Sequence, residues 1–403
     1  MPTTETAKDR EQLTQRLREL RHQLHRYPEL SAHETETTAL LISELTALGL
    51  EIPQLGLSTG TVAVLRGGAP GPVVGLRADI DALPVEEHTH AACASRHPGV
   101  MHACGHDVHT AALFGAAVLL SRRRASLHGT VVLIFQPAEE TVNGAQSIIA
   151  SGLFEKYRLQ ALLCLHVWPG LPEGTVGVGD GAFLSAVDSF QITVTGRGGH
   201  GSMPYLSVNP IPCGAALALA VPATMGYDLP PEETAAVSVC SVQSGCCDNA
   251  IPDACTLLGT ARTFSEAARQ AVLGRLRTLT EGTAAAYRCG GDVRIDHSIP
   301  PVVNHPVLAD IMRRSAVKVL GEGACRTLAP VMISEDFAYY RACVPICCTL
   351  FGVGTGDLLH SPSFFPPDSV LLPAASFLAE SAVQMLCDQN LPLSERRNDD
   401  ASY

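Results

Sequence analysis

The sequence predicts an α/β protein in which a domain with a mostly parallel sheet is interrupted by a smaller inserted domain. Three observations support this prediction. The chain has 403 residues, which exceeds the usual size of one domain. Short, wholly apolar runs alternate with helix-like stretches in the first part of the chain. Further along, the pattern changes to strands with one apolar and one polar face.

The first part of the chain begins with an amphipathic helix. Leucines recur at helical spacing among charged residues, and this pattern stops before Pro28. The apolar runs that follow are typical of strands buried on both faces, and helical stretches such as Ala111–Leu120 separate them. This order indicates a largely parallel sheet. The leucines are Leu13, Leu17, Leu20 and Leu24, and the apolar runs are Val73–Leu76, Val131–Phe135 and Leu162–Leu165.

A second domain is expected to begin near Leu184. Phe190, Ile192 and Val194 alternate there with polar residues, as in a strand that is wet on one face. The elements then follow the βαββαβ order of a ferredoxin-like unit. They are expected at Ser189–Thr195, Ile211–Met225, Ala236–Val242, Cys255–Arg262, Ser265–Tyr287 and Asp292–Ser298.

The pattern of the first domain resumes after Pro300 and Pro301. Helices are expected at His305–Leu320 and Pro373–Cys387. We therefore divide the chain into a first part of the larger domain (1–183), an inserted domain (184–299) and a second part of the larger domain (300–403).

Composition and charge exclude several classes of partner. A net charge of −12 repels polyphosphates, and the largest basic cluster is Arg122–Arg124, so no nucleic acid is expected. The start Met1–Glu11 is polar, so we expect no export signal there. No uninterrupted apolar run reaches about eighteen residues, so we expect no membrane span. The 14 cysteines are scattered or adjacent, which favours reduced thiols and a cytoplasmic protein.

Polar residues directly follow three of the predicted strands. Asp79 and Asp81 follow the first apolar run, Glu139 and Glu140 the second, and His166 the third. Because ligands gather at the carboxyl ends of the strands in an open α/β sheet, these side chains are expected to converge. The run Met101–His109 adds His102, Cys104, His106 and His109, whose thiolate and imidazole groups are strong ligands for zinc and similar ions.

Each of these features has an ordinary explanation when it is taken alone. A Cys-x-His triplet is more often packing than ligation, and a Glu-Glu pair is usually a solvated loop. His166 fits a core histidine, and His360 fits a loop residue. Their joint occurrence at strand ends favours a metal site, because burying several carboxylates and imidazoles together is costly unless a cation compensates them.

Seven segments together resemble the amidohydrolase branch of the M20 metallopeptidase family, which includes hippurate hydrolases and auxin-conjugate hydrolases. They occur in the family's order over almost the whole chain. The resemblance implies a catalytic domain interrupted by a small lid that also forms the dimer interface, in agreement with the domain division above. The segments are Leu24–Leu30, Leu76–Pro84, Met101–Asp107, Phe135–Glu140, Gly198–Gly201, Ser334–Phe337 and Leu359–Pro362.

The resemblance also implies a set of site residues for a centre of two divalent metal ions. Glu139 is then the general base. Asp79 either orients a metal ligand by a hydrogen bond without binding the metal itself, or is simply a capping residue after the strand. We expect Cys104 to bridge the two ions, with Glu140 and His360 on one and His106 and His166 on the other. Zinc or manganese suits these donors, and nickel or cobalt is also compatible with them. The implied metal ligands are Cys104, His106, Glu140, His166 and His360.

Three residues of the inserted domain complete the expected site. In the family, the histidine that matches His200 reaches the partner subunit's active site and stabilises the oxyanion, so a homodimer through the inserted domain is expected. Asn249 and Arg262 match substrate-binding positions. Arg262 either pairs with the substrate carboxylate through its planar fork or forms a surface salt bridge.

The expected activity is hydrolysis of the amide bond of small N-acyl amino acids. The motif Cys104–Asp107 and the arginine at Arg77 favour this branch over a dipeptidase or carboxypeptidase of the same superfamily. A catalytically silent metal-binding protein is a further alternative, although the base and all five ligands are present. Four positions depart from the expected family pattern and leave the substrate open: Tyr205, Asn209, Ile333 and Ser363.

Overall fold

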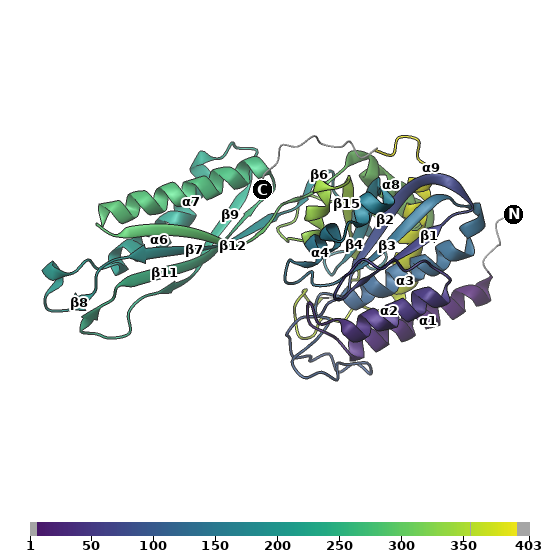
Figure 1. Ribbon diagram of the computed structural model, residues 1–403, viewed down its shortest axis with the longest axis horizontal. Coiled ribbons are helices and arrows are strands. Elements are labelled where there is room, and N and C mark those ends of the chain that lie inside the picture. The colour runs from purple at the N-terminus through teal and green to yellow at the C-terminus, as the bar shows by residue number, and fades with distance from the viewer. Residues whose placement is uncertain (1–5, 355, 393–403) are drawn as a thin grey trace. The chain divides into compact units, whose positions relative to one another are not determined.

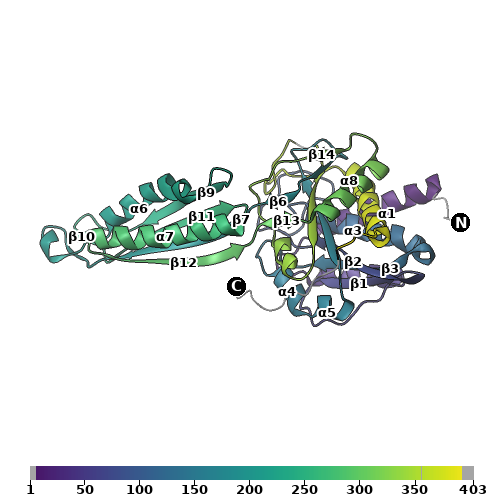
Figure 2. The same ribbon diagram turned by 90° about the horizontal axis from the view of Figure 1, so that it is seen from above.

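The computed structural model describes residues 6–354 and 356–392, and the chain divides into two compact units (Figures 1 and 2). The large unit comprises Met1–Gly181, Val303–Ala329 and Tyr339–Tyr403, and the small unit comprises Ala182–Val302 and Pro330–Ala338. The domain division expected from the sequence differs in that the two boundaries of the inserted domain shift by two or three residues and in that 330–338 belongs to the small unit. Backbone hydrogen bonds hold this segment there, from Val331 N to Phe183 O (2.8 Å) and from Ser185 N to Ile333 O (2.8 Å).

The large unit is built on a seven-stranded mixed sheet in the order β1-β3-β2-β4-β15-β5-β14. Four of its six neighbouring pairs are parallel, as expected, whereas β1 pairs with β3 and β15 pairs with β5 in antiparallel fashion. The sequence did not predict these two antiparallel pairs. The strands are β1 (Thr61–Arg66), β2 (Ala69–Asp79), β3 (His128–Gln136), β4 (Ala161–Trp168), β5 (Val176–Val178), β14 (Cys325–Thr327) and β15 (Ile346–Gly352).

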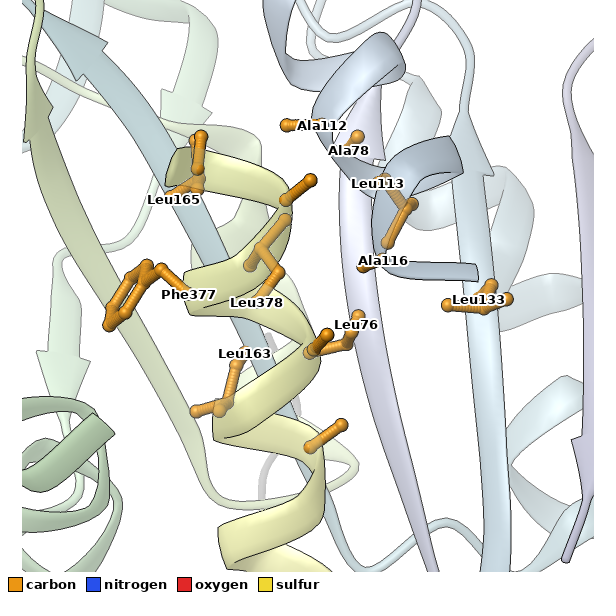
Figure 3. Packing of buried hydrophobic residues seen from close by; sticks show 14 of the residues in the cluster. Leu76, Ala78, Ala112, Leu113, Ala116, Leu133, Leu163, Leu165, Phe377 and Leu378 are labelled. Atoms are coloured by element: carbon orange, nitrogen blue, oxygen red, sulfur yellow. The ribbon is translucent and has the colours of Figure 1, made fainter. Parts of the chain in front are cut away.

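Helices α3 and α9 pack together against the central strands. In Figure 3, Leu113 and Ala116 of α3 and Phe377 and Leu378 of α9 lie beside apolar side chains of the sheet such as Leu76. Burial of this apolar surface is the main favourable contribution to folding. The helices of the unit are α1 (Ala7–Arg26), α2 (Thr35–Ala47), α3 (His106–Arg122), α4 (Gly144–Ala150), α5 (Leu153–Tyr157), α8 (Pro306–Leu320) and α9 (Leu371–Cys387).

The stretch Asp368–Cys387, which contains α9, is the one helical segment in the described parts of the chain that is long and apolar enough to cross a membrane. Most of its apolar part is buried within the fold. Its apolar residues recur every three or four positions and belong to the core shared with α3, so packing accounts for its composition.

The small unit has an antiparallel four-stranded sheet in the order β12-β7-β11-β9. Its elements follow the expected order of strand, helix, two strands, helix and strand. Strand β7 alternates buried and half-buried residues, and its buried side chains share one core with residues of both long helices. The elements are β7 (Ala186–Thr195), α6 (Ile211–Thr224), β9 (Ala235–Gln243), β11 (Ala254–Thr263), α7 (Glu266–Ala286) and β12 (Gly290–Ile299).

Short elements complete the described chain. Strands β8 and β10 form a separate antiparallel pair within the small unit. The short strands are β6 (Gly181–Leu184), β8 (Gly199–His200), β10 (Ala250–Ile251) and β13 (Val302–Asn304), and the 3-10 helices are Arg124–Ser126, Pro204–Leu206, Met225–Asp228, Asp336–Ala342 and Asp368–Val370.

Candidate metal centre

The predicted site residues of the large unit gather at the carboxyl ends of three adjacent strands. Asp79 ends β2, Glu139 and Glu140 follow β3, and His166 lies near the end of β4. Because β2 is parallel to both β3 and β4, these ends meet at one edge of the sheet. Helix α3 begins at His106 beside this edge, five residues earlier than the helical stretch expected from the sequence.

Gly105 allows the loop that carries Cys104 and His106 to approach β4 closely. Its φ of 84° is in the left-handed region, and a Cβ there would lie 2.5 Å from Val167 Cγ2. Any other residue at 105 would therefore both strain the backbone and push the loop away from His166.

Among the described residues, five groups of side chains could hold a metal ion, and two of them contain Cys104; within each group the donor atoms lie within 4.8 Å of one another. The first group is Cys104, His106 and His166, and the second is Cys104, Glu140 and His360. Cys104 Sγ lies 3.4 Å from His166 Nε2, and Glu140 Oε1 lies 3.7 Å from His360 Nε2. The backbone N–H of His360 also donates to Ala103 O (2.8 Å), which ties this distant loop to the Cys104 segment.

The buried polar atoms of this cluster fit a cation. Nε2 of His106 and Oε1 of Glu140 are both buried, and neither has a hydrogen-bond partner among the described residues. They lie 3.8 Å apart. Leaving such atoms without partners costs roughly 1–3 kcal/mol each, and a divalent ion beside them would compensate this cost. A thiolate, imidazoles and a carboxylate are a suitable donor set for zinc and similar ions.

In both His106 and His166, the ring nitrogen Nδ1 contacts an oxygen acceptor, so that Nε2 faces the cluster. His106 Nδ1 lies 3.0 Å from Asp81 O and 3.2 Å from its Oδ1, and His166 Nδ1 lies 2.8 Å from Val167 O. Such partners fix both the orientation and the tautomer of a ligating imidazole. Asp81 also accepts the backbone N–H of Glu140 at 3.0 Å. The sequence singled out Asp81 only as a residue after a strand and did not predict its contacts with both His106 and Glu140.

Asp79 orients a histidine that has no free nitrogen for a metal. Asp79 Oδ1 lies 2.6 Å from His109 Nδ1, while His109 Nε2 accepts the backbone N–H of Val167 (2.8 Å). His109, which the sequence offered as a possible ligand, is therefore occupied at both nitrogens. Burial would raise the pKa of Asp79, but His106, His109 and Arg77 hold it well below its usual range, so Asp79 is a carboxylate.

The cluster's charges favour positive charge at His106. Burial would lower the pKa of this imidazole, but Asp79, Asp81 and Glu140 raise it to about 10. Burial raises the pKa of Glu140 to about 7. Burial also holds the pKa of His166 well below its usual range, in the same direction as the repulsion from His109. A proton or a divalent cation beside His106 Nε2 would supply the charge that the carboxylates favour.

Glu139 lies beside this donor set. Its carboxylate belongs to a group with His106 and Glu140 whose donor atoms lie within 4.8 Å of one another. It is half-buried and opens a turn that directly follows Ala138, whose φ of 51° is unusual for a residue other than glycine. Such a conformation costs roughly 1–3 kcal/mol and persists only where the surrounding structure holds it.

The remaining predicted site residues belong to the small unit. His200 is exposed on β8, where it is paired with Ala250, and its Nδ1 lies 2.9 Å from Ser202 Oγ. Asn249 is also exposed, and its backbone oxygen accepts the N–H of Gly201 (2.8 Å). Arg262 donates to Ser334 Oγ (2.6 Å), so its partner here is a hydroxyl rather than the carboxylate of a surface salt bridge.

The sequence pattern of peptidase family M20/M25/M40 matches residues 75–384, which span the whole cluster. The chain belongs to this family. It is therefore a metal-dependent amide hydrolase of this family.

Individual M20 relatives resemble the chain over most of its length. An N-acetyl-L-cysteine deacetylase of Bacillus subtilis is 38% identical over 91% of this chain and 87% of its own. A hippurate hydrolase of Campylobacter jejuni is 33% identical over 91% and 96%. A crystal structure from B. subtilis, described as a dinuclear metal-binding peptidase of the M20 family, superposes with a TM-score of 0.83 at 36% identity, covering 93% of this chain and 99% of that one.

Proposed function

We propose that this M20 enzyme hydrolyses the amide bond of small N-acyl amino acids at a centre of two divalent metal ions. The observation that supports this most directly is that two groups of ligand atoms share Cys104, with Glu139 beside them. Cys104, Glu140 and His360 would hold one ion, and Cys104, His106 and His166 would hold the other. The names of two relatives, an N-acetylcysteine deacetylase and a hippurate hydrolase, both describe N-acyl amino acid substrates.

The bound ions would polarise the scissile carbonyl and lower the pKa of a water molecule. Zinc or manganese is proposed, and nickel or cobalt also suits this donor set. Cys104 and Glu140 supply the negative charge that retains the ions. Asp81 and Asp79 keep His106 and His109 in place and so limit the movement of the cluster.

Glu139 acts as the general base. Its carboxylate takes one proton from the attacking water and then delivers that proton to the nitrogen of the departing amine. The carbon–nitrogen bond breaks, and the products are a carboxylic acid and a free amino acid. This role needs a carboxylate close to the ligands but not used as one of them, and Glu139 stands next to the ligand Glu140 in both sequence and space.

The small unit is proposed to act as a ferredoxin-like lid that supplies three further groups. His200 donates to the oxyanion of the tetrahedral intermediate in the partner subunit. Arg262 binds the substrate carboxylate, and Asn249 contacts the substrate beside it. Burial lowers the pKa of Arg262, although a guanidinium remains charged at neutral pH. A planar, charged fork is well suited to a carboxylate.

We also propose a cytoplasmic homodimer that forms through the small unit. Strand β9 is at the edge of its sheet, and an edge strand can pair with another chain. Large apolar side chains are exposed on and after α6, including Leu219 (77% exposed) and Tyr227 (83% exposed). A second copy of the chain would cover these residues. None of the 14 cysteines, all of which lie in the described part of the chain, forms a disulfide, which suits a reducing compartment.

A substrate panel tests the proposed function. Metal-reconstituted enzyme is offered N-acetyl, N-benzoyl and indole-acetyl amino acids, and free amino acid is measured. Unblocked dipeptides are the matched alternative, since a dipeptidase or carboxypeptidase of the same superfamily would prefer them. Hydrolysis of N-acyl amino acids is the expected result, and activity on unblocked dipeptides alone would contradict it. The panel also shows how Tyr205, which is 79% exposed, Asn209, Ile333 and Ser363 affect the choice of substrate.

A further inference from the structure

Glu34 is a fully buried carboxylate whose position in the chain does not explain its burial. It occupies the position just before α2, where a side chain normally caps the helix, yet its carboxylate makes no capping bond. Glu29 does that work, because its Oε1 accepts the backbone N–H groups of Thr35 and Glu36 (3.1 Å each) and its Oε2 accepts that of Thr37 (2.8 Å). Capping of α2 therefore does not account for the position of the Glu34 carboxylate.

The two oxygens of Glu34 connect two other segments of the large unit. Oε1 accepts the backbone N–H of Ala138 (2.7 Å), and Oε2 accepts the hydroxyl of Thr59 (2.7 Å). Ala138 precedes Glu139 directly and is the residue with the left-handed φ of 51°. Glu34 thus anchors the turn of the general base, 104 residues further along the chain, at its strained position.

The surroundings of Thr59 leave this turn little freedom. A Cβ on Gly60 would lie 2.5 Å from Pro137 Cδ and 2.8 Å from Phe135 O, so this segment packs directly against the end of β3. The backbone N–H of Gly60 is held in turn by Thr38 Oγ1 (2.7 Å). On the other side of Glu139, Asp81 holds the backbone N–H of Glu140. Two buried carboxylates therefore hold the backbone on either side of the base.

We propose that Glu34 is a positioning residue for Glu139. This inference rests on the proposed function, in which Glu139 is the base. Without an acceptor, the N–H of Ala138 would be buried and unpaired, and the turn would relax from its left-handed conformation. Such relaxation would displace the Glu139 carboxylate from the attacking water. Misplacement by about 1 Å, even when caused by a residue far from the chemistry, can lower turnover about a hundredfold.

The test compares three variants with the wild-type enzyme. Glu34→Leu removes both acceptors at similar volume. Glu34→Gln retains an oxygen for Ala138 N–H, and its amide can donate to the Thr59 hydroxyl. Glu29→Ala is the matched control, since it removes the cap of α2 from the same loop without touching the turn of Glu139. Each variant is assayed with the N-acyl amino acid that the wild type hydrolyses fastest, and its metal content and Tm are measured.

The expected result separates positioning from stability. In Glu34→Leu, kcat falls about ten- to a hundredfold, while KM stays within about twofold and metal content equals that of the wild type. Glu34→Gln retains kcat within about threefold, because the hydrogen bond to Ala138 is kept. Glu29→Ala lowers Tm but leaves kcat unchanged. Hydrogen exchange on the full-length protein becomes faster in the peptide 136–144 of Glu34→Leu, and not in that of Glu29→Ala.

Several outcomes would overturn the inference. These are an unchanged kcat in Glu34→Leu, a loss of kcat that parallels a loss of metal, or a Glu34→Gln enzyme as slow as Glu34→Leu. If Glu34→Leu does not fold, Thr59→Val replaces it: a kcat at least about threefold lower at constant metal content supports the role, and an unchanged kcat refutes it. Failure of the proposed function is distinct, because the wild-type enzyme itself would then not hydrolyse any N-acyl amino acid.

Discussion

Two aspartates separated by one residue each hold a different buried histidine of the cluster, Asp79 holding His109 and Asp81 holding His106. Asp79 ends β2 and contacts Arg77 and His109, whereas Asp81 lies beyond the strand and contacts His106. Each carboxylate is buried, so its charge must be compensated by a close partner. The adjacent glutamates show a similar division, since Glu140 belongs to the ligand group that contains His360 and Glu139 does not.

Replacement of Glu139 by glutamine should remove the base and leave the ligands in place. We expect metal content near that of the wild type and turnover lower by at least about a hundredfold, the usual scale of general-base catalysis. Elemental analysis and steady-state kinetics on the same preparation check this. Near-normal turnover in Glu139→Gln would exclude the proposed mechanism.

Loss of Cys104 should affect both ions, because its thiol belongs to both ligand groups. We expect a chelator to abolish activity and Cys104→Ala to lose metal. Cys104→Asp should retain part of the metal, since a carboxylate can also bridge two ions. Elemental analysis that finds two ions per chain in Cys104→Ala would refute the bridging role.

At the scale of elements, a buried ion pair joins α1 to α3. Arg21 Nε lies 2.8 Å from Asp107 Oδ2, and both side chains are fully buried. Arg21 Nη1 also lies 2.7 Å from Asp368 Oδ1, and His25 Nδ1 lies 2.9 Å from Asp107 Oδ2. Asp107 follows His106 directly, so this network fixes the start of α3. It accounts for two residues of the family-like segments, His25 and Asp107, without giving either a role in metal binding.

Removing Asp107 should destabilise the large unit strongly. Asp107→Ala removes the fully buried one of the two carboxylates that contact the guanidinium of Arg21, and breaking such a pair typically costs about 3–5 kcal/mol. We expect a clearly lower Tm and a lower free energy of unfolding. Denaturant unfolding, with Arg66→Ala as the control for an exposed ion pair, measures the difference. Equal stabilities of the two variants would show that the network contributes little.

The same network predicts a dependence of stability on pH. Burial would lower the pKa of His25, but Asp107 outweighs it and raises the pKa above the ordinary value of 6.5. A raised folded-state pKa means that the contribution of His25 is fully present below about pH 6.5 and is lost as pH rises through the folded-state pKa. The stability advantage of wild type over His25→Gln should therefore shrink as pH increases. A Tm difference that grows with pH would contradict this.

At the scale of the whole molecule, the proposed dimer links the small unit to catalysis. His200 is exposed in a unit that contributes none of the five metal ligands proposed above, so it is useful to the chemistry only if it is brought to a metal centre. His200→Ala should keep its metals and lose turnover, because removal of an oxyanion donor costs on the order of 3 kcal/mol.

Mixing two inactive variants tests whether His200 acts in the partner subunit. A dimer of one His200→Ala chain and one Glu139→Gln chain contains one site with an intact base and an intact histidine. Random exchange of subunits should therefore restore roughly a quarter of wild-type activity. Mass measurement confirms the exchange. If mixed dimers form and remain inactive, His200 acts within its own chain or not at all.

The sequence by itself determined the elements and the chemical character of the site. Apolar periodicity is local, so the buried strands and the order of elements in the small unit could be predicted from residues such as Phe190, Ile192 and Val194. The donor residues were recognisable because they follow strands, and parallel strands bring their carboxyl ends to one edge. Glu140 and His166 could be selected in this way, whereas Cys104 and His106 were recognisable from the thiol and imidazole donors in the run before α3.

Only the tertiary structure decided which of these residues contact one another and which atoms remain available to a metal ion. Whether His109 is a ligand depended on Asp79 and on the backbone of Val167, and no local pattern in the sequence records these contacts. The antiparallel edge pairs and the place of 330–338 in the small unit likewise depend on pairing between distant segments. Glu34 is the clearest case. Its partner Ala138 lies 104 residues away, and a carboxylate just before a helix normally indicates a cap.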